Sequence, residues 1–299
     1  HVAIFYVLVD LFQRGRQRLV FETQFIMGAL VVMISGIEAL SWYFGLGILP
    51  GTEIGWIDAI GPGAWLPVAP VRLSLAMNIS TLLAGYVAPL VTLTGVWALT
   101  ARRPDYRQAL RLLTLGLLLV LIFTQSRGGL LSLATAVAAL LVMRAVQDRA
   151  ILRRIPRLAV VAALLGLVAG AAFIVSAQRT GGDLGRLDMY RSAVLIGRDY
   201  PITGVGPGLF GRALRDYRTR NIERDHMASA HNAPLNTLAE NGIAGIVISA
   251  WLGVALLRGW LHTWRAQTTD ARRLRVEAAI AALLGVAVHS MVDVFTVTP

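Results

Sequence analysis

The sequence predicts an all-α protein, a polytopic bundle of transmembrane helices with one extracytoplasmic helical loop region. Of its 299 residues, 56% are hydrophobic and only 15% are charged, whereas soluble domains are about half apolar and about a quarter charged. The apolar residues also gather in long blocks, and about 20 such residues cross the hydrocarbon core of a bilayer. Short arginine clusters separate the blocks, as in the cytoplasmic turns of membrane proteins.

The apolar runs define the expected helices. Residues 2–11 are typical of the last part of an apolar helix, which suggests that the chain begins partway through a longer protein and leaves any signal peptide undecided. Seven complete spans are expected, at 25–49, 77–99, 112–124, 130–143, 158–176, 243–260 and 276–294. The third and fourth runs are short for full crossings, so we expect tilted helices or segments that dip into the membrane.

The arginine clusters predict the topology. They lie at 14–18, 102–111, 149–157 and 265–275, and the positive-inside bias places them in the cytoplasm. Strict alternation then puts four polar segments on the opposite face: the loop 50–76, the SRGG turn 126–129, the long segment 177–240 and the HSMVD sequence 289–293. Among the unusual polar groups, only Glu38 is expected elsewhere. We therefore expect residues 1–176 and 241–299 to form transmembrane helices around an extracytoplasmic loop, 177–240, that carries site residues.

Charge and cysteine content exclude several classes of protein. The net charge is +11, and all 28 basic residues are arginine. Because most of them lie in turns between apolar blocks and no nucleic-acid recognition fold accompanies them, we expect no nucleic-acid partner. The absence of cysteine excludes disulfides and thiolate metal sites.

Ser126-Arg127-Gly128-Gly129 is the first sequence that could carry chemistry. An arginine costs roughly 2.5–3.5 kcal/mol at the middle of a bilayer unless it is paired. Arg127 could extend its charged end to the interface, or its planar guanidinium could hold a phosphate with two hydrogen bonds. Under the second interpretation, Ser126 and the glycines let the phosphate approach the backbone.

The second constellation spans residues 186–211. Asp188–Ile196 is expected to form a short amphipathic helix in which Asp188 and Arg191 could pair, being three residues apart. Its predicted apolar face consists of Leu187, Tyr190 and Val194. GVGPGLFG, at 204–211, resembles a glycine-rich phosphate cradle but lacks the strand-to-helix context of one. A turn that seats the preceding helix is favoured.

The third constellation is HNAPLNTLAENGIAG at 231–245. His231 could cap a helix or lie at an interface, or it could act as a general base, because imidazole accepts protons near neutral pH. One predicted helical face carries His231, Pro234 and Leu238. Glu240 is too far along the helix to be an obvious orienting partner for the imidazole. Asn241-Gly242 allows a break before the membrane helix.

The fourth constellation is His289-Ser290-Met291-Val292-Asp293. His289 and Asp293 would meet across one turn of a helix, where they could make a structural contact, orient the imidazole or bind a metal. Without an HExxH pattern or cysteines, we expect no metal site.

Taken in order, these sequences resemble the O-antigen ligase and O-antigen polymerase family over roughly residues 110–299. The resemblance rests on SRGG, then Arg191 followed by Pro201, three alternating glycines and Phe210, then HNxxLxxxxExGxxG and HSxxD. It implies a GT-C-like, all-helical glycosyltransferase of the inner membrane. Such enzymes take a glycan from a polyprenyl diphosphate carrier on the extracytoplasmic face and pass it to a glycan or lipid-linked acceptor. They use no nucleotide sugar, and the resemblance implies no metal or cofactor.

The resemblance also assigns residues. The loop arginine of the family falls on Arg191, the SRGG arginine on Arg127 and the loop histidine on His231, and these three are the expected catalytic residues. Tyr190 stands where many relatives carry tryptophan. The residues expected to bind substrate are Arg198, Asn232, Ser126 and His289. Ligase and repeat-unit polymerase activities both stay open.

Two functions from other classes are alternatives to the transferase. A transporter of lipid-linked or anionic substrates would suit a broken helix and a buried Glu38, but it would place ionisable groups at mid-membrane on several spans. An intramembrane hydrolase using Ser126 or Ser290 lacks a nucleophile-elbow context. The gathering of polar groups on one face favours the transferase.

Overall fold

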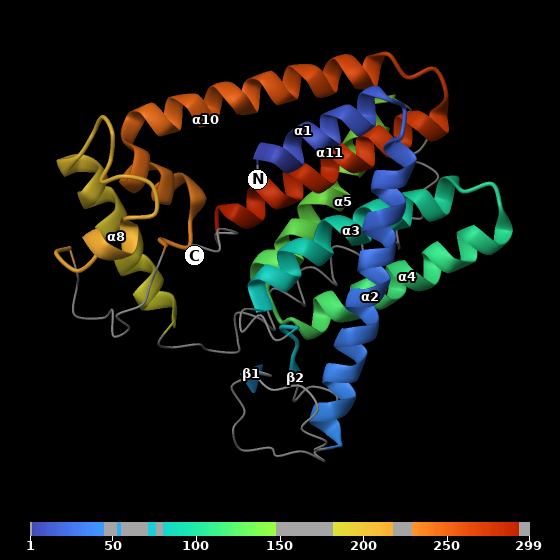
Figure 1. Ribbon diagram of the computed structural model, residues 1–299, viewed down its shortest axis with the longest axis horizontal. Coiled ribbons are helices and arrows are strands. Elements are labelled where there is room, and N and C mark those ends of the chain that lie inside the picture. The colour runs from blue at the N-terminus through green and yellow to red at the C-terminus, as the bar shows by residue number, and fades with distance from the viewer. Residues whose placement is uncertain are drawn as a thin grey trace. The chain divides into compact units, whose positions relative to one another are not determined.

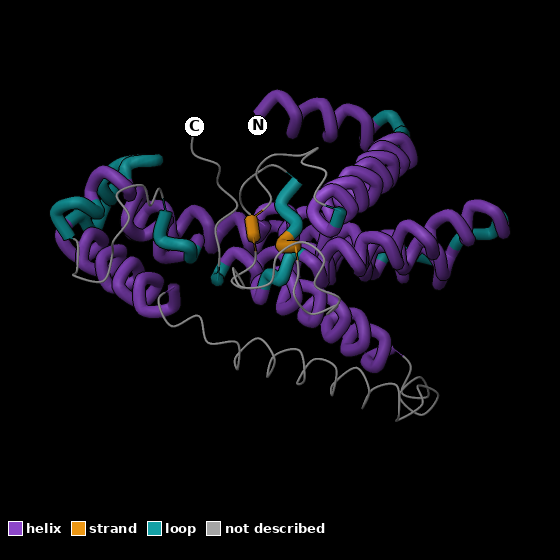
Figure 2. Tube along the Cα trace, turned by 90° about the horizontal axis from the view of Figure 1, so that it is seen from below, coloured by secondary structure: helices purple, strands orange, loops and turns teal. Residues whose placement is uncertain are grey.

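The computed structural model describes residues 2–44, 53–54, 71–75, 80–147, 182–217 and 229–292. Over these ranges the chain is all-helical, except that β1 (Glu53–Ile54) pairs antiparallel with β2 (Val71–Arg72) (Figure 2). The predicted all-α fold is therefore confirmed. The chain divides into two compact units, His1–Leu133 and Ala134–Pro299.

Five of the described helices are long and apolar enough to cross a membrane, which makes this a multi-pass membrane protein. They are α2 (Gln17–Tyr43), α3 (Ser80–Thr100), α4 (Pro104–Phe123), α5 (Arg127–Gln147) and α10 (Ala233–Arg265). The predicted span 158–176 lies outside the described residues. The predicted span 276–294 corresponds to α11 (Asp270–Ser290), whose first turns are rich in charge.

The first unit is built on the hairpin of α3 and α4, with α2 against both helices and α1 (Val2–Gln13) before α2 (Figure 1). The α3 helix is the most enclosed of the five candidate spans. The apolar core of the first unit includes Leu83 and Val87 of α3 and Leu117 and Leu121 of α4. Small residues let the helices approach, since a Cβ added at Gly116 of α4 would lie 2.7 Å from Cγ1 of Val32.

The helices on either side of QSRGG are long enough to cross a membrane, so the predicted bounds, 112–124 and 130–143, were too short. They have 20 and 21 residues, or about 30 Å of helix at 1.5 Å per residue. The prediction failed because it counted only apolar residues. The α4 helix begins in the polar sequence from Pro104 to Arg111, and α5 begins at Arg127 itself.

Glu38 has a structural partner in the first unit. Its buried carboxylate accepts hydrogen bonds from the backbone N–H groups of Ser74 (3.2 Å) and Leu75 (3.0 Å). Because α2 ends at Tyr43, Glu38 lies in the last two turns of the helix and not in the middle of a span. The carboxylate therefore fixes the segment that follows β2 at one end of α2.

The second unit contains the rest of α5 with α8 (Gly182–Asp199), α9 (Phe210–Ala213), α10 and α11. The α8 helix packs on α10, and it is longer than the predicted 188–196. The prediction of its apolar face was wrong, since Leu187 and Val194 are 52% and 49% exposed. The buried face instead carries Met189, Ala193 and Ile196. Close packing decides this, because a Cβ added at Gly197 would lie 2.7 Å from Cγ of Leu238 in α10.

The α10 helix begins at Ala233, ten residues before the predicted start, and bends at Gly242, where the backbone is not helical (φ 61°, ψ −159°). The two parts of the helix run in different directions in Figure 1. The break predicted at Asn241-Gly242 is thus confirmed. The helix starts early because Asn232 caps its first turn.

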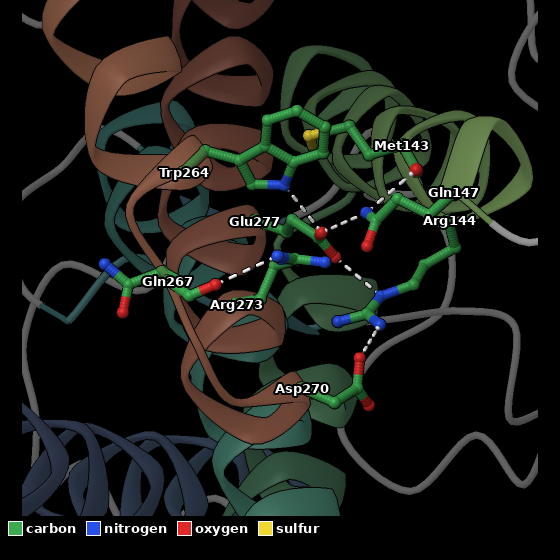
Figure 3. Close-up of polar contacts among 8 residues, drawn as sticks. All are labelled: Met143, Arg144, Gln147, Trp264, Gln267, Asp270, Arg273 and Glu277. Carbon is green, nitrogen blue, oxygen red and sulfur yellow. Dashed lines mark hydrogen bonds and ion pairs between the residues drawn. The ribbon is translucent and has the colours of Figure 1, made fainter.

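A buried carboxylate joins three helices at the end of α10 opposite this bend (Figure 3). Glu277 of α11 is fully buried, and its Oε2 lies 2.6 Å from Nε of Arg144 in α5. Its Oε1 accepts hydrogen bonds from the side chains of Gln147 and, at 2.8 Å, Trp264. Arg144 also pairs with exposed Asp270 at 2.5 Å. Three charged side chains and two neutral donors therefore connect α5, α10 and α11.

Candidate active site

The glycine-rich turn after α8 and the bend of α10 form one hydrogen-bonded module. The N–H groups of Ile243 and Ala244 donate to the carbonyls of Pro201 (2.8 Å) and Ile202 (3.3 Å). In a regular helix they would donate to the carbonyls of Ala239 and Glu240. Those two carbonyls instead accept from Val205 and Gly206, both at 2.9 Å. The bend therefore exchanges two helical hydrogen bonds for four bonds to the turn.

Two glycines are required for this exchange. Gly204 and Gly242 both have positive φ, 64° and 61°. A Cβ on Gly204 would lie 2.5 Å from the backbone nitrogen of Asn241, and one on Gly242 would lie 2.7 Å from the carbonyl oxygen of Pro201. The N–H groups of Gly204, Val205 and Gly206 all have backbone acceptors. GVGPGLFG is thus the seating turn that the sequence favoured, and these three N–H groups are not a phosphate cradle.

We expect Gly242→Ala to destabilise the protein by at least about 2 kcal/mol, because the new methyl group meets backbone and a left-handed conformation is costly for alanine. Thermal unfolding in detergent measures the change. Gly253→Ala in the same helix is the matched control and should change stability little, since no atom lies within 4 Å of the added Cβ. Equal effects of the two substitutions would contradict the exchange at the bend.

Glu240 supports the same module, a role that the sequence did not reveal. Its side chain is buried, and Oε1 accepts a hydrogen bond from the backbone N–H of Phe210 at 3.2 Å. Phe210 is the first residue of α9, where N–H groups lack helical acceptors. Glu240 therefore caps α9 and holds it against α10. In the sequence, the only signal of this role was a carboxylate on a helix face that the structure buries.

His231 lies before α10 and not on it. Its φ is +50°, a left-handed conformation that is uncommon for residues other than glycine. The prediction that His231 shares a helical face with Pro234 and Leu238 was therefore wrong, because the helix begins at Ala233. Pro234 occupies the first turn, where a missing N–H is tolerated.

Asn232 connects the start of α10 to the end of α11. Its Oδ1 accepts from the N–H of Leu235 at 3.0 Å, and its Nδ2 donates to the carbonyl of Met291 at 2.7 Å. The next carbonyl, of Val292, accepts from Nη1 of Arg186 in α8 at 3.3 Å. Met291 and Val292 of the HSMVD sequence thus contact α8 and Asn232, the residue after His231. Binding of substrate by Asn232 stays a prediction.

His289 is fully buried near the end of α11, which ends at Ser290. Asp293, its predicted partner across one helical turn, lies outside the described residues. In the described part of the chain, no three His, Asp or Glu side chains gather as metal ligands would.

Arg191 extends from the exposed side of α8. Its side chain is 74% exposed, and Nη1 lies 3.4 Å from Oδ1 of buried Asp188. The pair predicted from their spacing is therefore confirmed. It leaves a cationic side chain that is oriented by a carboxylate yet accessible to a ligand.

Arg198 lies at the exposed end of α8 and donates to its neighbour Asp199 at 3.2 Å. The hydroxyl of Tyr217 donates to the same carboxylate at 2.8 Å. This hydrogen bond, and then the one from Arg198, lower the pKa of Asp199, while the carboxylate raises the pKa of Tyr217. The carbonyl of Tyr217 also accepts from Oγ of Ser192 at 2.9 Å, which ties the segment after α9 to α8.

Ser126 and Arg127 belong to the first unit. Oγ of Ser126 accepts from the N–H of Gly129 at 3.1 Å and so caps α5, of which half-buried Arg127 is the first residue. A Cβ on Gly129 would lie 2.6 Å from Cβ of Ala84, so helix packing explains this glycine. Arg191 and His231 belong to the second unit. The convergence of all three residues on one substrate stays a prediction.

Comparison with known proteins identifies the segment that carries these residues. The family model described as O-antigen ligase matches residues 112–249. The chain contains a domain of the O-antigen ligase family. The resemblance drawn from the sequence is thereby confirmed, and membership implies a membrane glycosyltransferase of the ligase type that acts on lipid-linked glycans. No curated protein matches the chain.

The matched segment contains six of the seven predicted site residues and the whole module of turn and bend. The six are Ser126, Arg127, Arg191, Arg198, His231 and Asn232. His289 lies beyond it. The O-antigen ligase domain therefore includes the predicted catalytic residues of both units. It also includes the structural elements that hold Arg191 and His231.

Proposed function

We propose that this O-antigen ligase family protein transfers a glycan from a polyprenyl diphosphate carrier to an acceptor hydroxyl at the extracytoplasmic face of the inner membrane. One observation in the second unit carries the proposal. The α8 helix, with its exposed Arg191, packs on α10, and α10 begins just after His231, whose backbone is left-handed. A cationic side chain on α8 and an imidazole just before α10 thus lie on segments that a shared module fixes. Family membership supplies the transferase chemistry.

The proposed reaction is a direct displacement at the anomeric carbon. The acceptor oxygen forms a bond to C1 of the glycan as the bond from C1 to the diphosphate oxygen breaks, with inversion at C1. His231 takes the acceptor proton as general base. The electron pair of the broken bond leaves with the diphosphate, whose growing negative charge Arg127 and Arg191 stabilise.

Three of the other predicted residues support this reaction by adding charge or by capping a helix. Arg198 adds positive charge on α8. Ser126 caps the helix that begins with Arg127, while Asn232 caps the helix after His231. Binding of substrate by His289, which is buried near the end of α11, stays a prediction. Under this proposal the helix N-termini add partial positive charge beside the diphosphate.

A repeat-unit polymerase of the same family is the second candidate. The outer segment, 177–240, spans only about 60 residues, which is modest for the recognition of a lipid A–core acceptor. The chemistry at C1 is the same in both cases. A transporter is not favoured, because buried Glu38 is bound to two backbone N–H groups and not presented to a substrate.

The deciding experiment supplies the purified protein in liposomes with a polyprenyl-diphosphate glycan and one of two acceptors. Lipid A–core tests the ligase, and a second carrier-linked repeat unit tests the polymerase. We expect one acceptor to gain the glycan while free polyprenyl diphosphate appears in equal amount. Movement of the donor across the bilayer without any new glycosidic bond would contradict a transferase and favour a transporter.

A further inference from the structure

The left-handed backbone of His231 is enclosed by two hydrogen-bonded residues. On one side, the N–H of buried Ala230 donates to Oδ1 of Asn236 at 3.0 Å. On the other side, the carbonyl of Asn232 accepts from the N–H of Asn236 at 2.8 Å. One residue of α10 therefore binds the chain both before and after His231.

We infer that Asn236 is a positioning residue for His231, a role that rests on the proposed function of the imidazole. A left-handed residue other than glycine persists only where its surroundings hold it, because the conformation is costly. Asn236 supplies that constraint, since its side chain fixes residue 230 and its backbone fixes residue 232. Asn236 thereby orients the imidazole through the backbone on either side of it.

The side chain of Asn236 suits this role because its Oδ1 accepts a hydrogen bond. Asn236 is buried on the first turn of α10, where an unpaired backbone N–H is costly. Asn236→Leu keeps the branching at Cγ but removes the acceptor, leaving the N–H of Ala230 without it. Asn236→Asp keeps an acceptor at the same place. The two variants therefore separate the hydrogen bond from the packing.

Kinetics give the first test. We expect Asn236→Leu to lower kcat for glycan transfer by about 10-fold or more while KM for the polyprenyl-diphosphate donor stays within about twofold, because the variant misplaces a base and leaves donor binding intact. Asn236→Asp should restore kcat to within about threefold of the unaltered protein. A rise in donor KM at unchanged kcat would overturn the inference, as would equal losses in both variants.

Unfolding gives a second test that does not depend on activity. His231→Gly should unfold at a higher temperature than His231→Ala, because glycine adopts positive φ without strain. In the Asn236→Leu background, this difference should disappear if Asn236 holds the left-handed turn. Persistence of the difference would overturn the inference. If His231 variants retained full transfer activity, the proposed base would fail, yet the unfolding comparison would still decide whether Asn236 fixes the backbone.

Discussion

Replacing either His231 or Arg191 with alanine is expected to lower the rate of glycan transfer by about 10²–10⁴-fold. The range follows from the usual contributions of a general base and of a donor that stabilises developing charge. His231 would no longer take the acceptor proton, and Arg191 would no longer balance the departing diphosphate. Initial rates with a polyprenyl-diphosphate donor in liposomes measure both losses.

Each variant should stay folded and inserted. His231 is only half-buried, and the side chain of Arg191 is largely exposed, so neither substitution removes a buried side chain. Arg191→Lys should restore little activity, because an ammonium group cannot make the paired planar contacts of a guanidinium. Arg215→Ala is the matched control, since this exposed arginine of the outer segment lies outside the predicted site. Full transfer activity in the His231 or Arg191 variant would remove that residue from the mechanism.

Replacing Glu277 with alanine is expected to destabilise the second unit by about 3–5 kcal/mol, the usual cost of removing one member of a buried ion pair. Glu277 is fully buried, and its partner Arg144 is only 14% exposed, so the guanidinium would keep its charge in a poorly solvated position. The side chains of Gln147 and Trp264 would also lose their acceptor. Thermal unfolding in detergent, or resistance to a denaturing detergent, measures the change.

Asp270→Asn provides a matched control for Glu277, because Asp270 pairs with the same arginine. Asp270 is 80% exposed, and exposed ion pairs contribute at most about 1 kcal/mol. Glu277→Gln should fall between the two variants, since an amide retains an oxygen that can accept from Trp264 but loses the charge. If Asp270→Asn cost as much stability as Glu277→Ala, burial would not be what makes this network important.

Local features of the sequence predicted the local features of the structure. Asp188 and Arg191 are three residues apart on one helix, so their contact depends on helix geometry alone. The Asn-Gly pair predicted the bend at Gly242 because glycine adopts positive φ without strain. The ordered SRGG, glycine-rich and HNxxL sequences identified the family, which the match over residues 112–249 confirms.

Errors arose where the ends or faces of helices depend on their neighbours. The α4 and α5 helices continue into polar residues, so apolar runs alone made them too short. The buried face of α8 follows its packing on α10 through Gly197, which leaves the larger Leu187 and Val194 exposed. His231 was assigned to a helix because its left-handed φ has no sequence signal in a residue other than glycine.

The sequence by itself determined the membrane class, the order of most helices, the family and the residue types available for chemistry. These depend on hydrophobic length, charge bias and the order of short sequences along one chain. Only the tertiary structure decided the contacts of Glu38, Gly204, Asn236, Glu240 and Glu277. Phe210 and Glu240 are 30 residues apart, and Arg144 and Glu277 are far more distant. The choice of partner for a buried polar group over such separations depends on how helices pack, because many donors along the chain could satisfy the same acceptor.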